Sequence, residues 1–287
     1  MTFGLLGGDA RFGYLAEAAS RSFDRVICFG LDSFGFHQPI LQTDSLNGVC
    51  EQDILLLPLP VTKDGKTLFA PLAKKEIFLS DLAACIKPNQ FVLGGKIDPA
   101  FTAVLREKGA EVTDYFKRED LARQNALPTA EGALWMLMQN TVITVHKAKT
   151  LVIGYGRVGK AVADLLTRVG AEVTVAVRRR EVVAELEQNG IHAILLSSLK
   201  TVMPGLDILI NTVPAPVVTA EHLSLASPQL YGLDLASAPG GIDFKAAEAL
   251  GIKAEPAPSL PGKIAPKTAG EILWKTVQTI IKETDYE

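Results

Sequence analysis

The segment Lys149–Arg180, which reads KTLVIGYGRVGKAVADLLTRVGAEVTVAVRRR, constrains the fold of this chain more than any other stretch. An apolar run predicts a strand over Thr150–Ile153. A glycine-rich turn follows, and a helical pattern then leads into a second strand over Glu172–Val177. A strand, a G-x-G-x-x-G turn and a helix in this order are typical of a βαβ unit that binds a dinucleotide. The alternative is a unit of the same type that binds none.

Each glycine of the turn has a distinct physical role in such a unit. Gly154 permits the tight turn, Gly156 lets the backbone approach a pyrophosphate, and Gly159 allows the helix to pack closely on the strand. The helix N-terminus adds backbone N–H groups and the positive end of the helix dipole. We therefore predict that the cofactor contacts Gly154, Tyr155, Gly156, Arg157, Val158 and Gly159.

Three arginines, Arg178, Arg179 and Arg180, follow the second strand of this unit. NAD-binding proteins usually carry an acidic residue here, which bonds the ribose hydroxyls. A guanidinium instead binds a 2′-phosphate through two hydrogen bonds. The alternative is a solvated basic helix start, which is mildly unfavourable beside the helix dipole. The sequence therefore favours NADP over NAD, with all three arginines in the cofactor site.

Polar residues also end two later strands of the same half. Asn211, Thr212 and Val213 close one apolar run, and Asp234 closes the next. Strand carboxyl ends face the ligand crevice in open α/β sheets. We predict that these four residues contact the cofactor; the alternative is plain capping of the strand ends.

Strand and helix patterns alternate along the chain. Strands are predicted over residues 2–8, 25–29, 53–59, 90–94, 111–116, 150–153, 172–177, 207–213, 229–235 and 253–256. This alternation predicts an α/β fold with two doubly wound parallel-sheet domains, the second a Rossmann dinucleotide-binding domain, joined by crossing helices.

The domain boundaries follow from the same patterns. Residues 1–128 form an N-terminal substrate-side domain, and residues 129–147 a linker helix with Pro128 just before it and Thr129 as N-cap. Residues 148–266 form the NADP-binding domain. The helix over 267–287 is expected to pack back on the first domain.

Two groups of residues are candidates for holding an anionic substrate. The turn GGDAR offers the backbone of Gly8, together with Asp9 and the cation of Arg11. The loop and helix start near the C-terminus offer Ser259, Lys267 and Thr268. The alternative is that these are ordinary turn glycines and surface charges.

Composition excludes several classes of function. The 287 residues carry a formal net charge of −3, which argues against a nucleic-acid partner. The three cysteines have no metal-type or CxxC spacing, so we expect reduced thiols and no metal. The N-terminus lacks a signal peptide pattern and no apolar run would span a bilayer, so a cytoplasmic location without membrane contact is expected. The sequence assigns no catalytic acid, base or nucleophile.

Five motifs of this chain resemble those of the dipicolinate synthase A subunit family. They are GGDAR, PTAEGALWM, VIGYGRVG, INTVP and the long segment DLASAPGGIDFKAAEALGIKAEPAPSLPGKIAPKTAGEIL. Lys263 departs from the family pattern, in which an apolar residue is usual, so Lys263 receives no substrate role.

The resemblance implies oxidation of a dihydrodipicolinate-type dicarboxylate to dipicolinate with a nicotinamide cofactor. It also implies that a flavoprotein-like B subunit is the partner, and it implies the mother-cell cytoplasm during sporulation. A homo-oligomer is expected. Two alternatives stay open: another NAD(P)-dependent amino-acid or hydroxyacid dehydrogenase, and a non-catalytic NADP-sensing protein.

Overall fold

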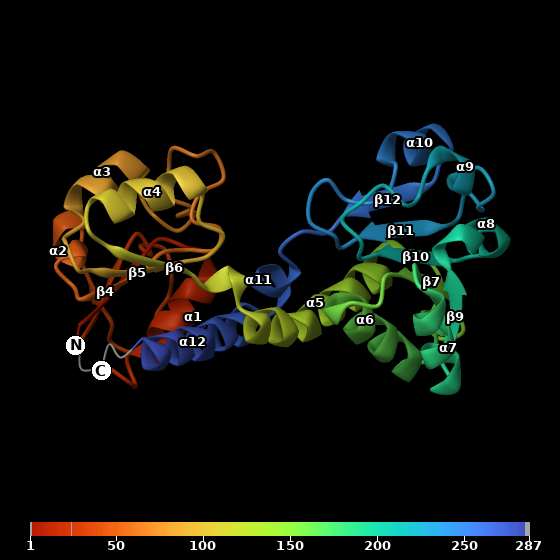
Figure 1. The fold of residues 1–287 in the computed structure, drawn as a ribbon, viewed down its shortest axis with the longest axis horizontal. Coiled ribbons are helices and arrows are strands. Elements are labelled where there is room, and N and C mark those ends of the chain that lie inside the picture. Colours follow the sequence, from red (N-terminus) through yellow and green to blue (C-terminus); the bar gives the residue numbers. More distant parts are fainter. Residues whose placement is uncertain (1, 24, 285–287) are drawn as a thin grey trace. The chain divides into compact units, whose positions relative to one another are not determined.

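The chain folds into two compact units, shown as a computed structural model in Figure 1, which describes residues 2–23 and 25–284. Unit 1 comprises the described residues up to Asn125 together with those from Pro261 onward, and unit 2 comprises Ala126–Leu260. Each unit is built on one six-stranded sheet whose strand pairs are all parallel. The predicted α/β class with two parallel sheets is confirmed.

The sheet of unit 1 has the strand order β3-β2-β1-β4-β5-β6. Its strands are β1 (Phe3–Leu6), β2 (Val26–Phe29), β3 (Leu41–Gln42), β4 (Ile54–Leu56), β5 (Phe91–Gly94) and β6 (Glu111–Asp114). Successive side chains alternate between the two faces, as the pleat requires. Leu5 and Leu56 belong to the core on one face, and Leu6 and Leu55 to the core on the other.

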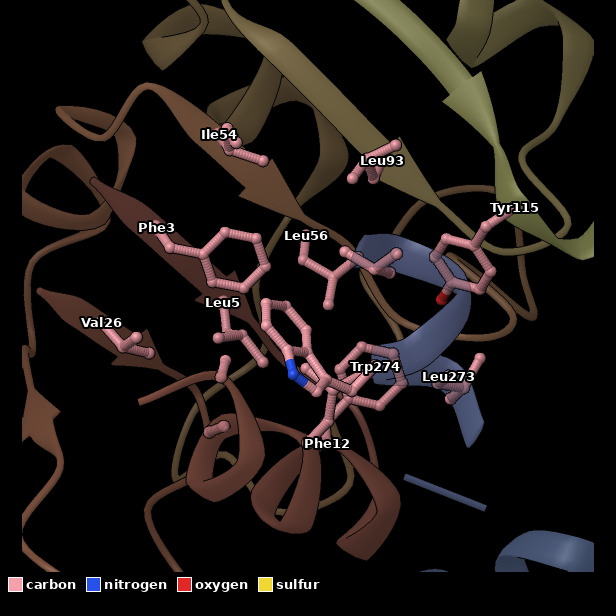
Figure 2. Packing of buried hydrophobic residues seen from close by; sticks show 14 of the residues in the cluster. Phe3, Leu5, Phe12, Val26, Ile54, Leu56, Leu93, Tyr115, Leu273 and Trp274 are labelled. Atoms are coloured by element: carbon pink, nitrogen blue, oxygen red, sulfur yellow. The ribbon is translucent and has the colours of Figure 1, made fainter. Parts of the chain in front are cut away.

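Helices cover both faces of this sheet. They are α1 (Ala10–Ala19), α2 (Leu46–Cys50), α3 (Leu79–Cys85), α4 (Pro99–Glu107) and α12 (Pro266–Glu283), with a 3₁₀ turn over Tyr115–Lys117. Figure 2 shows Phe3, Phe12 and Trp274 in the core that α1 and α12 share, and the rings of Phe3 and Trp274 lie 5.5 Å apart. The two helices approach so closely that a Cβ atom on Gly270 would lie 2.3 Å from the carbonyl oxygen of Arg11. The end of the chain thus completes the N-terminal core.

The sheet of unit 2 has the strand order β12-β11-β10-β7-β8-β9. Its strands are β7 (Lys149–Ile153), β8 (Glu172–Val177), β9 (His192–Leu195), β10 (Ile208–Asn211), β11 (Tyr231–Asp234) and β12 (Lys253–Pro256). The helices are α6 (Arg157–Arg168), α7 (Arg180–Gln188), α8 (Leu199–Val202), α9 (Ala220–Leu223) and α10 (Phe244–Ala249), with a 3₁₀ turn over Leu196–Ser198. Two buried clusters fill the two faces of this sheet.

Both units therefore have the same connectivity. In each, the first three strands run outward in one direction and the next three in the other, which is the doubly wound order. The order reverses between β1 and β4 in unit 1 and between β7 and β10 in unit 2. Ligands of such folds bind outside the strand carboxyl ends at this reversal, which places the glycine turn after β7 at the expected position.

The helix predicted over residues 129–147 has different limits in the structure. Helix α5 spans Glu119–Asn140 and contains Pro128, which is buried inside it instead of preceding it. The helix begins with acidic residues in its first turn, where the helix dipole favours them. It ends at Asn140 because the next five residues, TVITV, are all β-branched and lose side-chain freedom in a helix.

Several short elements were not predicted from the sequence, among them two strands and a helix. These are the edge strands β3 and β9 and the helix α11 (Leu260–Ile264), which lies in the loop predicted near the C-terminus. Strand β3 has only two residues, which is too short for a periodic apolar pattern. Among the described residues, no helix is both long enough and apolar enough to cross a membrane.

Candidate functional site

The glycine turn of unit 2 connects β7 to α6. Gly154 has φ +92°, in the left-handed region that favours glycine. A Cβ atom on Gly159 would lie 2.2 Å from the Gly154 carbonyl oxygen, so a glycine is required for this helix to start so near the strand. At Gly156 no heavy atom lies within 4 Å of the Cβ position. The turn thus has two glycines that serve packing and one that faces open space.

The N-terminus of α6 has no side-chain cap. Gly156 is the N-cap residue, and no side chain accepts a hydrogen bond from the first turn there. Arg157 is exposed, while Tyr155 and Val158 are half-buried beside the turn. The backbone N–H groups at a helix N-terminus and the positive dipole end together favour an anion. The geometry therefore fits the pyrophosphate of a dinucleotide.

Arg178, Arg179 and Arg180 follow β8, the strand next to β7. All three are exposed, and Arg179 is the N-cap residue of α7. Within residues 2–23 and 25–284, none of the three guanidinium groups forms an ion pair or a hydrogen bond. Guanidinium groups can bind phosphate through two hydrogen bonds each, so the chemistry of this strand end fits a phosphate group.

Asn211 and Asp234 anchor loops in the structure, and their contacts with the cofactor stay a prediction. Both are buried, and Asn211 Nδ2 donates to Asp234 Oδ1 at 2.8 Å and to the Val213 carbonyl oxygen at 2.9 Å. Asn211 Oδ1 accepts the Val213 N–H at 3.1 Å. The Asp234 carboxylate also accepts three backbone N–H groups, those of Ala236, Gly241 and Ile242. The polar atoms of both side chains are thus engaged within the protein.

Thr212 and Val213 lie beneath the glycine turn. The Thr212 hydroxyl donates to the Ile153 carbonyl oxygen at 2.8 Å, and a Cβ atom on Gly154 would lie 2.5 Å from this hydroxyl oxygen. The side chain of Thr212 therefore supports the turn. Both residues are half-buried at the reversal of strand order, so their backbone remains at the predicted edge of the site.

The corresponding turn of unit 1 is closed by its own side chains. Asp9 is the N-cap of α1, and its Oδ1 accepts the Arg11 N–H at 3.1 Å. Arg11 Nε and Nη2 each donate to the Asp9 carboxylate at 2.8 Å, and Nη2 also donates to the Leu59 carbonyl oxygen at 2.8 Å. Arg11 is only 6% exposed. Arg11 is therefore paired with Asp9, and its contact with an anionic substrate stays a prediction.

The other substrate candidates are divided between the two units. Gly8, with φ +100°, donates its N–H to the Phe69 carbonyl oxygen at 2.8 Å, so this amide is engaged. Lys267 and Thr268 are exposed in the first turn of α12 in unit 1. Ser259 is exposed with φ +60° and belongs to unit 2.

The histidines form local contacts. His37 Nδ1 lies 3.1 Å from Glu17 Oε1, and His192 Nδ1 lies 3.2 Å from Glu187 Oε1. His222 completes the capping box of α9. In the part of the chain that the structure describes, no three His, Cys, Asp or Glu side chains gather as metal ligands.

Two lysines that were not predicted as site residues lie along a cavity in unit 1. Lys63 and Lys96 are both exposed, and the cavity has a volume of about 500 Å³. A sequence signal for Lys96 exists, because it follows Gly94 and Gly95 directly after a buried strand. Such a strand end is where α/β folds place ligand contacts.

Comparison with known proteins gives matches for both halves of the chain. Residues 2–116 match the family described as the N-terminal domain of the dipicolinate synthase A subunit. Residues 130–228 match the D-isomer specific 2-hydroxyacid dehydrogenase NAD-binding domain. The second match coincides with the glycine turn, so unit 2 is a nicotinamide dinucleotide-binding domain of the dehydrogenase type.

Individual relatives match over nearly the full length. The chain is 30% identical over 257 residues to the dipicolinate synthase A subunit of Bacillus subtilis, covering 88% of this chain and 86% of that protein. The crystal structure of the dipicolinate synthase A subunit from Bacillus halodurans has a TM-score of 0.87 at 31% identity, covering 98% of this chain and 97% of that chain. The Bacillus subtilis crystal structure also has a TM-score of 0.87, at 30% identity, covering 99% of this chain and 96% of that chain.

Proposed function

Because the chain belongs to the dipicolinate synthase A subunit family, we propose that it oxidises a dihydrodipicolinate-type intermediate to dipicolinate with NADP⁺. The observation that carries the proposal is the open, uncapped glycine turn beside three unpaired arginines. When bound, the nicotinamide accepts a hydride from the substrate ring. The ring also loses one proton, and the products are NADPH and an aromatic pyridine dicarboxylate.

The residues of unit 2 fit the cofactor. The free space at Gly156 and the first amides of α6 would hold the pyrophosphate. The guanidinium groups that follow β8 would hold a 2′-phosphate. No carboxylate stands directly after β8, where it would repel that phosphate. These features support NADP over NAD.

Asn211 and Asp234 contribute by positioning. Their hydrogen bonds fix the segments that follow β10 and β11 at the strand carboxyl ends. The segment that follows β10 then supports the glycine turn through Thr212. Fixed loops reduce the freedom that must be lost when cofactor and substrate are brought together. The proposed substrate contacts are those predicted from the sequence: Gly8, Asp9, Arg11, Ser259, Lys267 and Thr268.

The reaction places modest demands on acid–base groups. Aromatisation of the ring drives the loss of hydride, so the protein mainly aligns the ring carbon with the nicotinamide and excludes water. A hydroxylated substrate would additionally require a group that promotes loss of water.

The cellular setting of the proposal follows the family. We propose action during sporulation in the mother cell, together with the flavoprotein-like B subunit of dipicolinate synthase, and a homo-oligomeric state. Another amino-acid or hydroxyacid dehydrogenase remains the second candidate, because the NAD-binding match of unit 2 is to the 2-hydroxyacid dehydrogenases. A non-catalytic NADP sensor is the third.

A single-turnover assay separates these candidates. Excess protein with NADP⁺ is mixed with freshly prepared hydroxytetrahydrodipicolinate, with and without the B subunit, and absorbance is followed at 340 nm. We expect NADPH in an amount equal to the limiting substrate. Absence of NADPH in both arms would contradict the proposal. NADPH formed only with amino or hydroxy acids would favour the second candidate, and tight NADPH binding without any turnover would favour the third.

A further inference from the structure

A cavity of about 500 Å³ lies in unit 1 at the carboxyl edge of its sheet. Two of its lining residues, Pro60 and Thr62, follow β4, and two others, Lys96 and Ile97, follow β5. The volume lies in the range of pockets that hold small ligands, roughly 300–1,000 Å³. The carboxyl edge is also the edge at which α/β sheets bind ligands.

The two segments that form the cavity are fixed to each other by backbone hydrogen bonds. The Gly95 N–H donates to the Pro58 carbonyl oxygen at 3.1 Å, and the Val61 N–H donates to the Gly95 carbonyl oxygen at 3.0 Å. Lys63 follows Val61 by two residues, and Lys96 follows Gly95 directly. The ladder therefore places the two lysines on the rim of one cavity, although 33 positions separate them in the sequence.

The side chain of Lys63 and the backbone of Lys96 are each held by a contact. Lys63 Nζ lies 4.1 Å from the centre of the Phe69 ring, in a cation–π contact. Lys96 has φ +55°, a conformation that costs free energy for a residue other than glycine, and its N–H donates to Asp114 Oδ1 at 2.9 Å. Among the described residues, no carboxylate pairs with either ammonium group.

The loop that carries Lys63 is ordered by its neighbour Asp64. The Asp64 carboxylate accepts hydrogen bonds from the N–H groups of Lys66 and Thr67, each at 2.8 Å. It also accepts the hydroxyl groups of Thr62 and Thr67. These bonds, the backbone N–H groups first, hold the pKa of Asp64 well below its usual range.

The charge of the cavity favours an anion. The charged lining residues are two lysines and one acidic residue, Asp98. Asp98 Oδ1 caps α4 by accepting the Ala100 N–H at 2.8 Å. Arg11, by contrast, is neutralised by Asp9, so it cannot serve as the unpaired cation of unit 1. Pro60, which lines the cavity, directly follows Leu59, whose carbonyl oxygen accepts a hydrogen bond from Arg11.

We propose that this cavity binds the carboxylate groups of a small dicarboxylate, with Lys63 and Lys96 as its charged partners. The choice of a dicarboxylate rests on the proposed function, whereas the location rests on the cavity and its unpaired lysines. The two ammonium groups supply hydrogen-bond donors, and Ile97 and Pro60 supply apolar contact for a ring. Each lysine is a binding residue and takes no part in the transfer of hydride.

Calorimetric titration of the full chain with pyridine-2,6-dicarboxylate tests this proposal. The buffer is metal-free, because this ligand chelates divalent cations. We expect binding by the unmodified protein, with Kd raised tenfold or more in both Lys63→Gln and Lys96→Gln. Lys75→Gln, at an exposed lysine outside the cavity, should change Kd less than twofold. Lys96→Gly, which relieves the left-handed backbone, should weaken binding as Lys96→Gln does.

A second ligand tests whether both lysines are used. Pyridine-2-carboxylate should bind the unmodified protein at least tenfold more weakly, and this difference should shrink in each lysine variant. No binding of the dicarboxylate by the unmodified protein, or unchanged Kd in the lysine variants, would overturn the proposal. Titration of the same samples with NADP⁺ is the control: unchanged binding shows that a variant is folded and that its cofactor site is intact. If NADPH still forms but the lysine variants bind the dicarboxylate normally, the cavity proposal fails and the proposed function stands. If binding depends on the lysines but no NADPH forms, the cavity proposal stands and the proposed function fails.

Discussion

Two helices begin where the strand order reverses, one in each unit, and they differ in their N-cap residue. In unit 1 the cap is Asp9, whose carboxylate fills the position of an anion and pairs with Arg11. In unit 2 the cap is Gly156, which offers neither a side chain nor a competing charge. The same backbone topology thus gives one closed turn and one turn open to a phosphate.

The Asp9→Ala variant should destabilise unit 1 by about 3 kcal/mol, since it leaves the buried Arg11 charge unpaired and removes a helix cap. Asp98→Ala is the matched control, because Asp98 caps α4 but forms no ion pair with the described residues; its cost should be about 1 kcal/mol. Urea unfolding followed by Trp274 fluorescence in a Trp135→Phe background measures both. Equal losses in the two variants would show that the Asp9–Arg11 pair adds nothing.

Thiol reactivity offers another test at the scale of single residues. Burial raises the pKa of the Cys28 and Cys50 thiols to about 12, so at pH 8 only about one in ten thousand of each is the reactive thiolate. Cys85 is half-buried. Iodoacetamide at pH 8 should therefore alkylate Cys85 alone in the folded protein and all three thiols in urea, as mass spectrometry would report. Modification of Cys28 at the rate of Cys85 would contradict this.

At the scale of elements, the turn between β7 and α6 contains one glycine that packing requires and another that is proposed to contact the cofactor. Gly159→Ala should lower the melting temperature by several degrees, because its Cβ atom would meet the Gly154 carbonyl oxygen at 2.2 Å. Gly156→Ala should leave the melting temperature within about two degrees, because its Cβ position is open and its φ of −76° suits alanine. It should nevertheless weaken NADP⁺ binding at least tenfold. Calorimetry measures both effects, and unchanged affinity in Gly156→Ala would exclude this turn as the pyrophosphate site.

The central parallel strands and the glycine turn could be predicted from the sequence because their signals are local. The strand of Phe91–Gly94 is a fully buried apolar run, and the glycine turn has a fixed spacing. The limits of α5 could not be predicted from the sequence, because its start depends on whether packing tolerates the buried Pro128 inside the helix. The Asp9–Arg11 pair and the engagement of Asn211 with Asp234 were missed because hydrogen-bond partners depend on side-chain direction and tertiary contact.

At the scale of the whole molecule, one topology occurs twice with different uses. Both sheets have the doubly wound order, but only unit 2 combines an uncapped turn with unpaired cations on the next strand, as far as the described residues show. We therefore predict that one NADP⁺ binds per chain. Hydrogen exchange should show protection of residues 154–160 and 178–182 on addition of NADP⁺, with residues 7–12 of unit 1 unchanged. Equal protection of both turns would contradict a single site.

The most direct test of the central claim is the affinity for NADP⁺ and NAD⁺ before and after the Arg178→Gln substitution. Charge-assisted hydrogen bonds to a phosphate contribute about 1.5–3 kcal/mol, so Kd for NADP⁺ should rise about tenfold or more. Kd for NAD⁺ should change less than about twofold, and the control Arg168→Gln, at the opposite end of α6, should alter neither. Unchanged NADP⁺ affinity in Arg178→Gln, or an equal loss for both cofactors, would contradict the assignment of this strand end to the 2′-phosphate.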